Sequence, residues 1–393
     1  MIVSAPTIAP RILITSYSGE LGGMEIRMAE EARLLRANGY TPSIAVRNFR
    51  GVDQWSEQLR QQGVPVCHYD PPPFIEDWSW RHVNKARAWL FSRALLKQAK
   101  PALVHVFFCW TFYGGSALWL AHKCGIPSII SVHNAFPLTR LPRWTEQHMR
   151  EAFLSLKGVY GVSQSALDHF LANYRPLLRP DIKTAVIPNS VDTSRFIPNP
   201  AARKQIRQQL GIADNVLLLG AVGRMSVQKK PLELIQMLAG LMSRRPDICF
   251  LFVGSGPLLE EARALVQQLG LQQQILFAGF RDNPWDYFAA LDLHVLNSRN
   301  EGFGMATAEA MACGVPAIGT DVPGTRDILR DCPGGMLIPA DDDAEKTELL
   351  FRLLQEPERL RQMANSARTY VETHFARPLI ELQLLAFYRE ILS

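Results

Sequence analysis

The chain has 393 residues, and at about 100–200 residues per domain this length predicts two or three domains. With 47% hydrophobic and 20% charged residues, the composition is that of an ordinary globular protein. Its 26 Gly and 26 Pro residues show no period, which excludes collagen-like and largely disordered classes. The formal net charge of +5 is uneven, because 22 Lys and Arg stand against 14 Asp and Glu through Arg195, and 20 against 23 beyond it. A basic front half predicts an anionic partner there, such as a membrane surface, a phosphate or a nucleic acid.

In the front half, short apolar segments predict strands and longer amphipathic segments predict helices. The strands are expected at Arg11–Tyr17, Thr41–Val46, Val64–Tyr69, Ala102–Phe108, Ser128–Val132 and Ala185–Ile187. The helices are expected at Met24–Asn38, Val83–Ala99 and Gly115–Cys124. Alternation of nearly all-apolar strands with helices predicts a parallel, doubly wound sheet covered on both faces. Ligands bind such sheets at the carboxyl ends of the strands.

The segment Pro188–Pro200 interrupts this pattern with Pro, Asn and Ser and is the predicted linker. Beyond it the alternation resumes, with strands expected at Val216–Val222, Ile248–Val253, Gln274–Phe277, Leu291–Leu296 and Ala317–Gly319. Helices are expected at Leu232–Arg244, Leu258–Leu269, Met305–Cys313 and Ala344–Leu354, and then from Leu349 to Leu392 with breaks near Pro357 and Pro378. We therefore predict domains over residues 1–190 and 191–378, followed by a helix over 379–393 that packs across the domain junction.

The cysteines and the hydrophobic segments bear on the compartment. Six cysteines form no CxxC pair, none has His at metal-ligand spacing, and most lie in apolar runs as buried free thiols do. They are Cys67, Cys109, Cys124, Cys249, Cys313 and Cys332. This pattern predicts a reducing compartment. We also expect no signal peptide and no transmembrane helix, because the sequence has neither a signal pattern nor about 18 consecutive uncharged apolar residues.

The most informative motif is NSRNEGFGMATAEAMACGVP, which follows a predicted strand and contains Glu301 and, eight residues later, Glu309. The glycines allow close approach of the backbone to a ligand. The amides of Phe303, Gly304 and Met305 would point out of a helix N-terminus, which favours a phosphate. Two carboxylates at this spacing suit hydrogen bonds to hydroxyl groups, as in sugars. In the alternative interpretation, Glu309 is a solvated helix residue and Glu301 a loop charge. That interpretation would be favoured for a lone Glu, but it is not favoured for the whole motif.

The stretch from Glu301 to Pro316 resembles the Glu-x7-Glu signature of retaining GT-B glycosyltransferases, especially family 4 (glycosyl transferases group 1). The usual form is E-x-F-G-x-x-x-x-E-A-M-A-x-G-x-P, and every fixed position is matched. The alternation, the linker and the final helix fit the same family over essentially the whole chain. The resemblance implies an α/β GT-B fold, with two Rossmann-like doubly wound domains and an interdomain cleft.

A second motif, GRMSVQKK, leaves the first strand of the back half. Arg224 and Lys229 occupy the positions of the family's G-R-x-x-x-x-K pair, which holds the donor diphosphate. Arginine offers a bidentate fork to phosphate oxygens and lysine a compact charge, so both would offset charge on the leaving group. The family usually has Gly after this lysine, whereas this chain has Lys230, so which of the two lysines contacts phosphate stays open.

The resemblance implies further site residues. Gly22 and Gly23 lie before the first long helix, in a loop that in the family approaches the donor phosphates and the acceptor. His133 follows a strand and would contact the transferred sugar through its side chain or its backbone carbonyl. Gly254, in the GSGP loop, and Arg281 would lie near the base and ribose. His105, inside an apolar strand, is interpreted as a core histidine with its hydrogen bonds satisfied.

Two segments invite other interpretations. The triplet Asp341–Asp343 resembles a metal site, but it precedes a helix, where Asp caps the N-terminus, and we expect no metal and no cofactor. The basic segment Arg81–Lys100 suits either an anionic membrane surface or a helix with its apolar face on the sheet, and the second interpretation is favoured.

The resemblance therefore implies a retaining, metal-independent hexosyltransferase. It would move sugar from a UDP-sugar or GDP-mannose to a glycan or lipid-linked acceptor in bacterial lipopolysaccharide, capsule or exopolysaccharide synthesis. We expect a cytoplasmic protein, with peripheral association at the inner face of the cell membrane as an open question, and no nucleic-acid partner. Alternatives are a non-catalytic sugar-nucleotide-binding scaffold and a nicotinamide oxidoreductase. The second is weak, because Ser18–Gly23 (SGELGG) lacks G-x-G-x-x-G.

Overall fold

The computed structural model describes residues 9–19, 21–73, 75, 82–108 and 110–393. The predictions for Cys109 and Arg81 lie outside these residues. The chain divides into a front unit, Met1–Ile187 with Glu381–Ser393, and a back unit, Pro188–Ile380. Both units are doubly wound α/β structures, so the GT-B architecture expected from the sequence is confirmed.

The front unit contains a parallel seven-stranded sheet in the order β3-β2-β1-β4-β5-β6-β7. The strands are β1 (Arg11–Ser16), β2 (Thr41–Val46), β3 (Val66–His68), β4 (Leu103–Phe108), β5 (Ser128–Val132), β6 (Leu156–Gly161) and β7 (Lys183–Val186). Its helices are α1 (Gly23–Ala37), α2 (Val52–Gln61), α3 (His82–Ala99), α4 (Gly115–Lys123), α5 (Arg143–Ala152) and α6 (Gln164–Tyr174). Every residue of β4 and β5 is buried, since helices cover both faces of the sheet.

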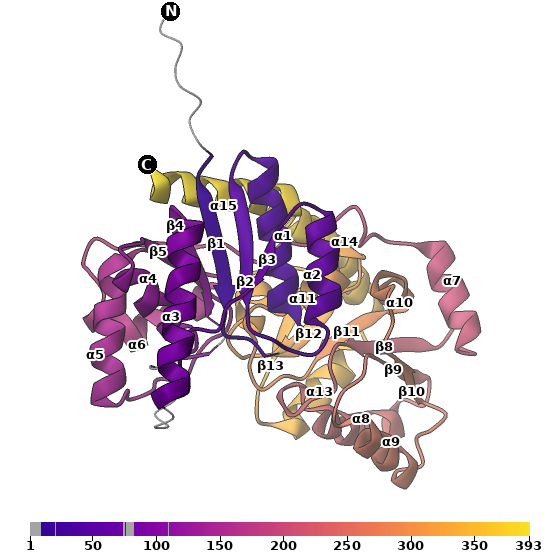
Figure 1. The fold of residues 1–393 in the computed structure, drawn as a ribbon. Helices are drawn as coiled ribbons and strands as arrows, with labels where there is room; N and C mark the ends of the chain where they lie inside the picture. The colour runs from indigo at the N-terminus through magenta and orange to yellow at the C-terminus, as the bar shows by residue number, and fades with distance from the viewer. Residues whose placement is uncertain (1–8, 20, 74, 76–81, 109) are drawn as a thin grey trace, which may run out of the picture. The chain divides into compact units, whose positions relative to one another are not determined.

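The back unit repeats this design with a parallel six-stranded sheet in the order β10-β9-β8-β11-β12-β13. The strands are β8 (Leu217–Val222), β9 (Ile248–Val253), β10 (Ile275–Gly279), β11 (Leu293–Leu296), β12 (Ala317–Thr320) and β13 (Gly335–Ile338). The helices are α7 (Pro200–Gln209), α8 (Pro231–Arg244), α9 (Leu259–Gln268), α10 (Pro284–Ala290), α11 (Met305–Ala312), α12 (Thr325–Leu329), α13 (Asp343–Leu353) and α14 (Pro357–His374). In Figure 1 this unit runs from pink to orange.

The last helix, α15 (Arg377–Leu392), begins in the back unit, and its residues from Glu381 onward belong to the front unit. Leu384, Phe387 and Tyr388 are buried there. A Cβ atom on Gly158 of β6 would come within 3 Å of the Phe387 and Ile391 side chains, so glycine lets this helix pack closely on the sheet.

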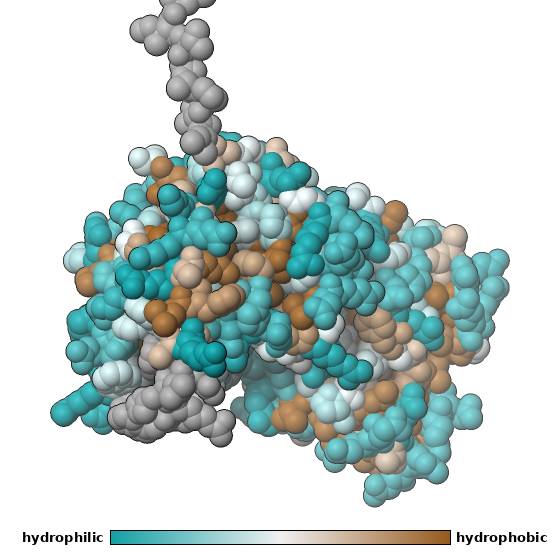
Figure 2. All heavy atoms as spheres, viewed as in Figure 1, coloured by the Kyte–Doolittle hydropathy of each residue, from teal (hydrophilic) through white to brown (hydrophobic). Residues whose placement is uncertain are grey.

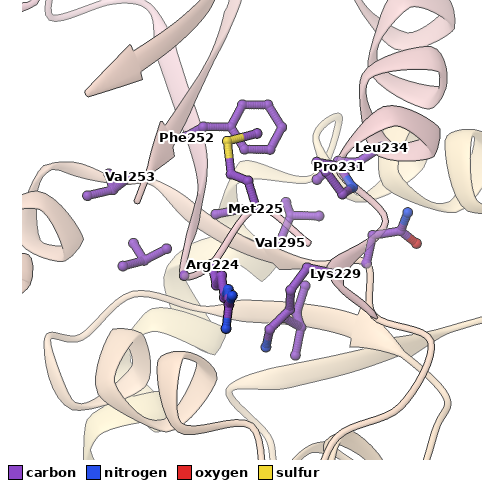
Figure 3. A pocket seen from close by; sticks show the side chains of 13 residues that line it. Arg224, Met225, Lys229, Pro231, Leu234, Phe252, Val253 and Val295 are labelled. Carbon is purple, nitrogen blue, oxygen red and sulfur yellow. The ribbon is translucent and has the colours of Figure 1, made fainter. Parts of the chain in front are cut away.

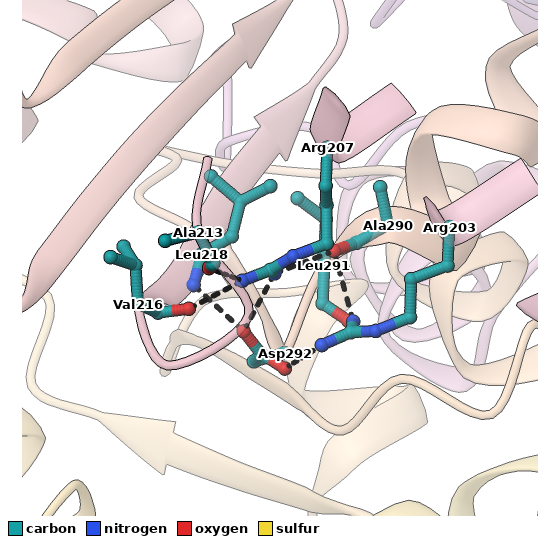
Figure 4. A network of polar contacts seen from close by, with 8 residues as sticks. All are labelled: Arg203, Arg207, Ala213, Val216, Leu218, Ala290, Leu291 and Asp292. Carbon is teal, nitrogen blue, oxygen red and sulfur yellow. Dashed lines mark hydrogen bonds and ion pairs between the residues drawn. The ribbon is translucent and has the colours of Figure 1, made fainter. Parts of the chain in front are cut away.

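Helix α7 is fixed to its sheet by a partly buried polar network (Figure 4). Arg203 and Arg207 both contact the carboxylate of Asp292, at 2.6 Å and 3.3 Å. Arg207 also donates to the backbone carbonyls of Ala213 and Val216, and Asp292 accepts from the amide of Leu218. The Asp292 carboxylate is thus shared by two guanidinium groups, which also donate to backbone carbonyls.

Several sequence predictions need correction. The chain break expected near Pro378 lies at Phe375 and Ala376, because proline is tolerated in the first turn of a helix and Pro378 lies there. The sequence pattern also misses α2, α5, α6, α7, α10, α12, β6 and β13. Most cysteines were expected to be buried, yet Cys67, Cys124 and Cys249 are partly exposed, and the five described cysteines are free thiols.

Candidate functional site

The back sheet has its switch point between β8 and β11, because the chain continues from β8 toward β9 and β10 and then returns to β11 on the other side. A pocket of about 380 Å³, open solvent included, lies at the carboxyl ends of β8, β9 and β11. Arg224, Lys229 and Asn297 are among its polar lining residues. In Figure 3 the Arg224 and Lys229 side chains both extend away from the side chains of Met225 and Phe252. A switch point is where ligands bind in open α/β sheets.

Glycine shapes the loop that carries Arg224. Gly254 has φ +138°, and a Cβ atom there would come within 2.0 Å of the Gly223 carbonyl oxygen. The loops after β8 and β9 are also hydrogen-bonded to each other. The Gly223 amide donates to the Val253 carbonyl, and the Met225 amide donates to the Ser255 carbonyl. Only glycine fits this close backbone approach, so the packing of the two loops explains why residue 254 is a glycine.

Lys229 connects the basic loop to the acid motif. Its Nζ atom lies 2.5 Å from Oε1 of Glu301, and the two side chains are 25% and 8% exposed. The Glu301 amide donates to the Pro323 carbonyl, and a side chain on Gly324 would collide with the Glu301 backbone. Glu301 is thus held at the carboxyl end of β11, beside the lysine.

Lys230 has a different role in the loop. It adopts the left-handed conformation (φ 46°, ψ 50°) just before α8, which is the region that favours glycine. Its ammonium lies 3.7 Å from the Asp341 carboxylate and 3.5 Å from the Ala340 carbonyl oxygen. The structure therefore places Lys229 on the pocket wall and directs Lys230 toward the segment before α13.

The second half of the acid motif forms the start of α11. Phe303 is buried and packs edge-on against Phe375, with ring centroids 5.1 Å apart. Gly304 precedes the helix with φ +93°, and Met305 is its first residue. Glu309 lies in the second turn and is partly buried. Glu301, the glycine turn and the helix N-terminus thus follow one another at the end of β11.

The other predicted donor-binding residue, Arg281, is exposed after β10 and lies over the Tyr287 ring, 5.5 Å from its centroid. It does not line the pocket described above.

The predicted front-unit residues are placed as follows. Gly22 is the N-cap of α1, and its amide donates to the Glu25 carboxylate at 2.9 Å, while Gly23 begins the helix. His133 follows β5, stacks on Phe107 with centroids 4.6 Å apart, and hydrogen-bonds Ser131. Burial lowers the pKa of His133 to about 3, and the Arg27 charge adds to this effect. The ring is therefore neutral near pH 7.

Asn297 is a site residue to which the sequence analysis gave no role. It is 2% exposed, its Nδ2 donates to the Lys230 carbonyl, and its Oδ1 has no hydrogen-bond partner among the described residues. Its sequence signal is its place directly after β11, where the side chain emerges at the carboxyl edge. Burial of such an oxygen is costly unless a ligand or water donates to it.

The aspartate triplet acts as a helix cap. The Asp342 carboxylate accepts from the Glu345 amide at 2.8 Å, and Asp343 pairs with the buried Lys346. Within the described part of the chain, no group of three or more His, Cys, Asp and Glu residues is arranged to hold a metal ion. None of the helices in that part is both long and apolar enough to cross a membrane.

Comparison with known families agrees with this geometry. The family model described as "Glycosyltransferase Family 4" matches residues 21–195, and "Glycosyl transferases group 1" matches residues 202–370. With two doubly wound units, the chain is a glycosyltransferase of the GT-B fold. It belongs to the group 1 and family 4 glycosyltransferases.

Individual relatives have low sequence identity to this chain but align with more than half of it. The D-inositol 3-phosphate glycosyltransferase of Thermomonospora curvata is 28% identical over 91% of this chain and 88% of its own length. The lipopolysaccharide core biosynthesis mannosyltransferase LpsB of Rhizobium meliloti is 30% identical over 54% of this chain, and the match spans 62% of that relative. The crystal structure of Anabaena HepE in complex with UDP has a TM-score of 0.80 at 20% identity, covering 97% of this chain and 100% of that one. This last likeness concerns the fold.

Proposed function

We propose that the back unit binds a sugar nucleotide, with its diphosphate at the pocket between β8 and β11. The observation that carries the proposal is the joint placement of Arg224 and Lys229 on that pocket, with Glu301 bonded to Lys229. Two cations lining one pocket suit a diphosphate, and a carboxylate paired with one of them suits sugar hydroxyls.

The remaining residues of the motif receive roles in the same arrangement. Glu309 would accept hydrogen bonds from ribose hydroxyls, and Gly254 and Arg281 would lie at the base. The amides of Phe303, Gly304 and Met305 would face the diphosphate from the N-terminus of α11. In the front unit, Gly22, Gly23 and His133 would serve the acceptor and the transferred sugar.

The proposed reaction retains configuration and needs no metal. The acceptor oxygen bonds to the anomeric carbon on the face from which the diphosphate departs, as the bond between that carbon and the phosphate oxygen breaks. The acceptor proton passes to the departing phosphate oxygen. Arg224 and Lys229 would stabilise the negative charge that develops there. This route requires no covalent nucleophile from the protein.

Nucleotide binding is the first test. A ligand that binds only the folded protein raises the melting temperature, so we expect UDP or GDP to raise it and ADP not to do so. Arg224→Ala should weaken binding of the active nucleotide by about 10- to 100-fold, the cost of losing a charge-assisted hydrogen-bond pair. Arg359→Ala is the matched control, because Arg359 is a half-exposed arginine on α14. Equal binding by the two variants would contradict the site.

Glu301→Ala separates donor binding from transfer. Turnover should fall by at least about 10²-fold, the scale for losing one positioned electrostatic partner. Free UDP, if it is the active nucleotide, should bind up to about tenfold more tightly, because Lys229 no longer pairs with a carboxylate. Initial rates and calorimetric titration measure the two effects. Unchanged turnover in a folded variant would refute the role of Glu301.

For the acceptor we propose a glycan or lipid-linked sugar of bacterial lipopolysaccharide, capsule or exopolysaccharide synthesis, in the cytoplasm. The relative LpsB, whose name refers to lipopolysaccharide core synthesis, supports this choice. The alternative is a scaffold that binds a sugar nucleotide without transferring it. Radiolabelled transfer from the donor to a membrane lipid extract would exclude the scaffold, whereas binding without transfer to any acceptor would favour it.

We further propose contact with an anionic membrane through α3. Leu90 and Phe91 are 59% and 61% exposed, and the basic residues Arg87 and Lys97 on the same helix are also exposed. Figure 2 shows apolar residues over this helix among hydrophilic ones. Vesicles with anionic lipid should sediment the protein, and vesicles of neutral lipid should not. Phe91→Ser should weaken this binding, and sedimentation independent of lipid charge would contradict it.

A further inference from the structure

A chain of hydrogen bonds in the interior of the front unit connects α1 with His133. Glu31 of α1 and His105 of β4 are fully buried, and their Oε1 and Nδ1 atoms lie 3.0 Å apart. His105 Nε2 lies 2.9 Å from the Ser131 hydroxyl, and His133 Nε2 lies 2.9 Å from the same hydroxyl. A carboxylate is thus linked through an imidazole and a hydroxyl to the histidine that follows β5.

The carboxylate at the buried end is held ionised. Tyr160 donates to its Oε2 at 2.9 Å and Tyr388 of α15 to its Oε1 at 2.6 Å, while Arg27 Nε lies 3.8 Å away. Burial alone would raise the pKa of Glu31, but the hydrogen bonds from His105 and Tyr388 and the Arg27 charge lower it below its ordinary value. An ionised carboxylate only accepts hydrogen bonds.

Because the Glu31 carboxylate can only accept, it fixes which group donates in each hydrogen bond of this series. The Tyr388 hydroxyl donates to Glu31, so its oxygen and Glu31 Oε1, at 2.7 Å and 3.0 Å from His105 Nδ1, both act as acceptors there, and Nδ1 carries a proton. In the neutral imidazole, Nε2 is then the acceptor nitrogen. His105 Nε2 then accepts from the Ser131 hydroxyl. The Ser131 oxygen, having donated its proton, accepts from Nε2–H of His133.

We propose that Glu31 is a positioning residue that sets the tautomer of His133, through His105 and Ser131, so that Nδ1 of His133 is a hydrogen-bond acceptor. An acceptor nitrogen there suits a hydroxyl of the transferred sugar or of the acceptor, and it cannot donate to a phosphate. The hydroxyl part of this inference rests on the proposed function, whereas the tautomer is a property of the protein alone.

The tautomer is measured by ¹⁵N NMR on protein labelled in the histidine rings, with His133→Gln used to assign the signals. In the wild-type protein we expect a protonated, pyrrole-type Nε2 and an unprotonated, pyridine-type Nδ1 for His133 at neutral pH. The opposite pattern, or an averaged one, would overturn the proposal without reference to activity.

Two variants test whether Glu31 is the cause. Glu31→Gln places an amide that donates to His105, which allows the chain to reverse, so the His133 signals should become averaged or exchange their types. Glu390→Gln is the control, because it makes the same change at an exposed glutamate of α15 that pairs with Lys183, and it should leave the His133 pattern as in the wild type. An unchanged pattern in a folded Glu31→Gln protein would refute the assignment. Should that variant not fold, Ser131→Ala, which interrupts the chain, must lose the single tautomer.

Activity gives the second measurement. Glu31→Gln should lower kcat by about tenfold, the loss of one aligned hydrogen bond, with nucleotide affinity unchanged because the proposed nucleotide site lies in the back unit. A reversed tautomer with full activity would refute the role of Nδ1 in transfer. Loss of nucleotide binding in Arg224→Ala tests the proposed function separately.

Discussion

At the residue scale, His294 of β11 is a buried histidine whose charge state bears on stability. It is fully buried, and this burial lowers its pKa from 6.5 to about 3, with the nearby Lys229 charge acting in the same direction. The unfolded chain therefore binds a proton below pH 6.5 that the folded chain does not bind. The free energy of unfolding is unaffected by this group above pH 6.5 and falls as the pH decreases from 6.5 toward 3.

We predict that His294→Leu reduces this acid sensitivity. Between about pH 7.5 and pH 5, the wild-type protein should lose about 2 kcal/mol more of unfolding free energy than the variant. Urea unfolding of both proteins at the two pH values measures the difference. His374→Leu is the control, since this histidine is exposed on α14. Parallel losses in wild type and His294→Leu would contradict the prediction.

The residues of the proposed site differ in how far the sequence predicts them. Arg224, Glu301 and Gly304 belong to long motifs, so their place at strand ends followed from the pattern, although their ligand contacts stay predictions. Asn297 and Glu31 were not predicted. A lone Asn after a strand has no distinctive spacing, and Glu31 is a charged residue on an amphipathic helix, which normally indicates solvent. Only the packing of β4, β6 and α15 around it makes it a buried carboxylate.

At the element scale, the loop before α8 has an unusual residue in its left-handed position. A lysine at φ 46° is strained compared with glycine, and the Lys230 ammonium recovers only contacts of 3.5 Å and longer. Lys230→Gly should therefore raise the free energy of unfolding by up to about 1 kcal/mol, because the strain outweighs the lost contacts.

Lys230→Ala is the matched variant, because it removes the ammonium and keeps the strained backbone. It should be less stable than Lys230→Gly by about 1 kcal/mol. Chemical denaturation of the three proteins decides the question. Equal stability of the two variants would show that the backbone conformation carries no cost.

The predicted elements also show where periodicity is informative. The sequence predicts β2, β5 and β9 with their exact bounds, because each is an apolar segment between turn residues. Strand β6 contains Lys157, Gly158 and Gly161, so it shows no apolar run. Its glycines serve tertiary contacts that local sequence does not reveal. Helix α5 is predominantly polar, and its position is fixed by packing against α4.

At the scale of the whole molecule, sequence order and structural membership differ at the C-terminus. The segment Glu381–Ser393 follows the back unit in the chain but belongs to the front unit. The sequence predicted a final helix that packs across the domain junction, and the contacts of Phe387 and Tyr388 show how its end is fixed within the front unit. The tail therefore completes the core of a domain that begins nearly four hundred residues earlier.

The last prediction concerns this tail. Phe387 is 5% exposed and packs edge-on against Tyr160 of β6, with centroids 5.6 Å apart, so Phe387→Ala should destabilise the front unit by about 3–5 kcal/mol. Leu382→Ala is the control on the same helix, since Leu382 is 67% exposed and should change stability by less than about 0.5 kcal/mol. Hydrogen exchange read by mass spectrometry separates the units: amides of β4, β5 and β6 should exchange faster in Phe387→Ala, and those of β8, β9 and β11 should not. Faster exchange in the back unit alone would contradict the assignment of the tail, because the cavity left by the phenyl ring would then lie in the wrong core.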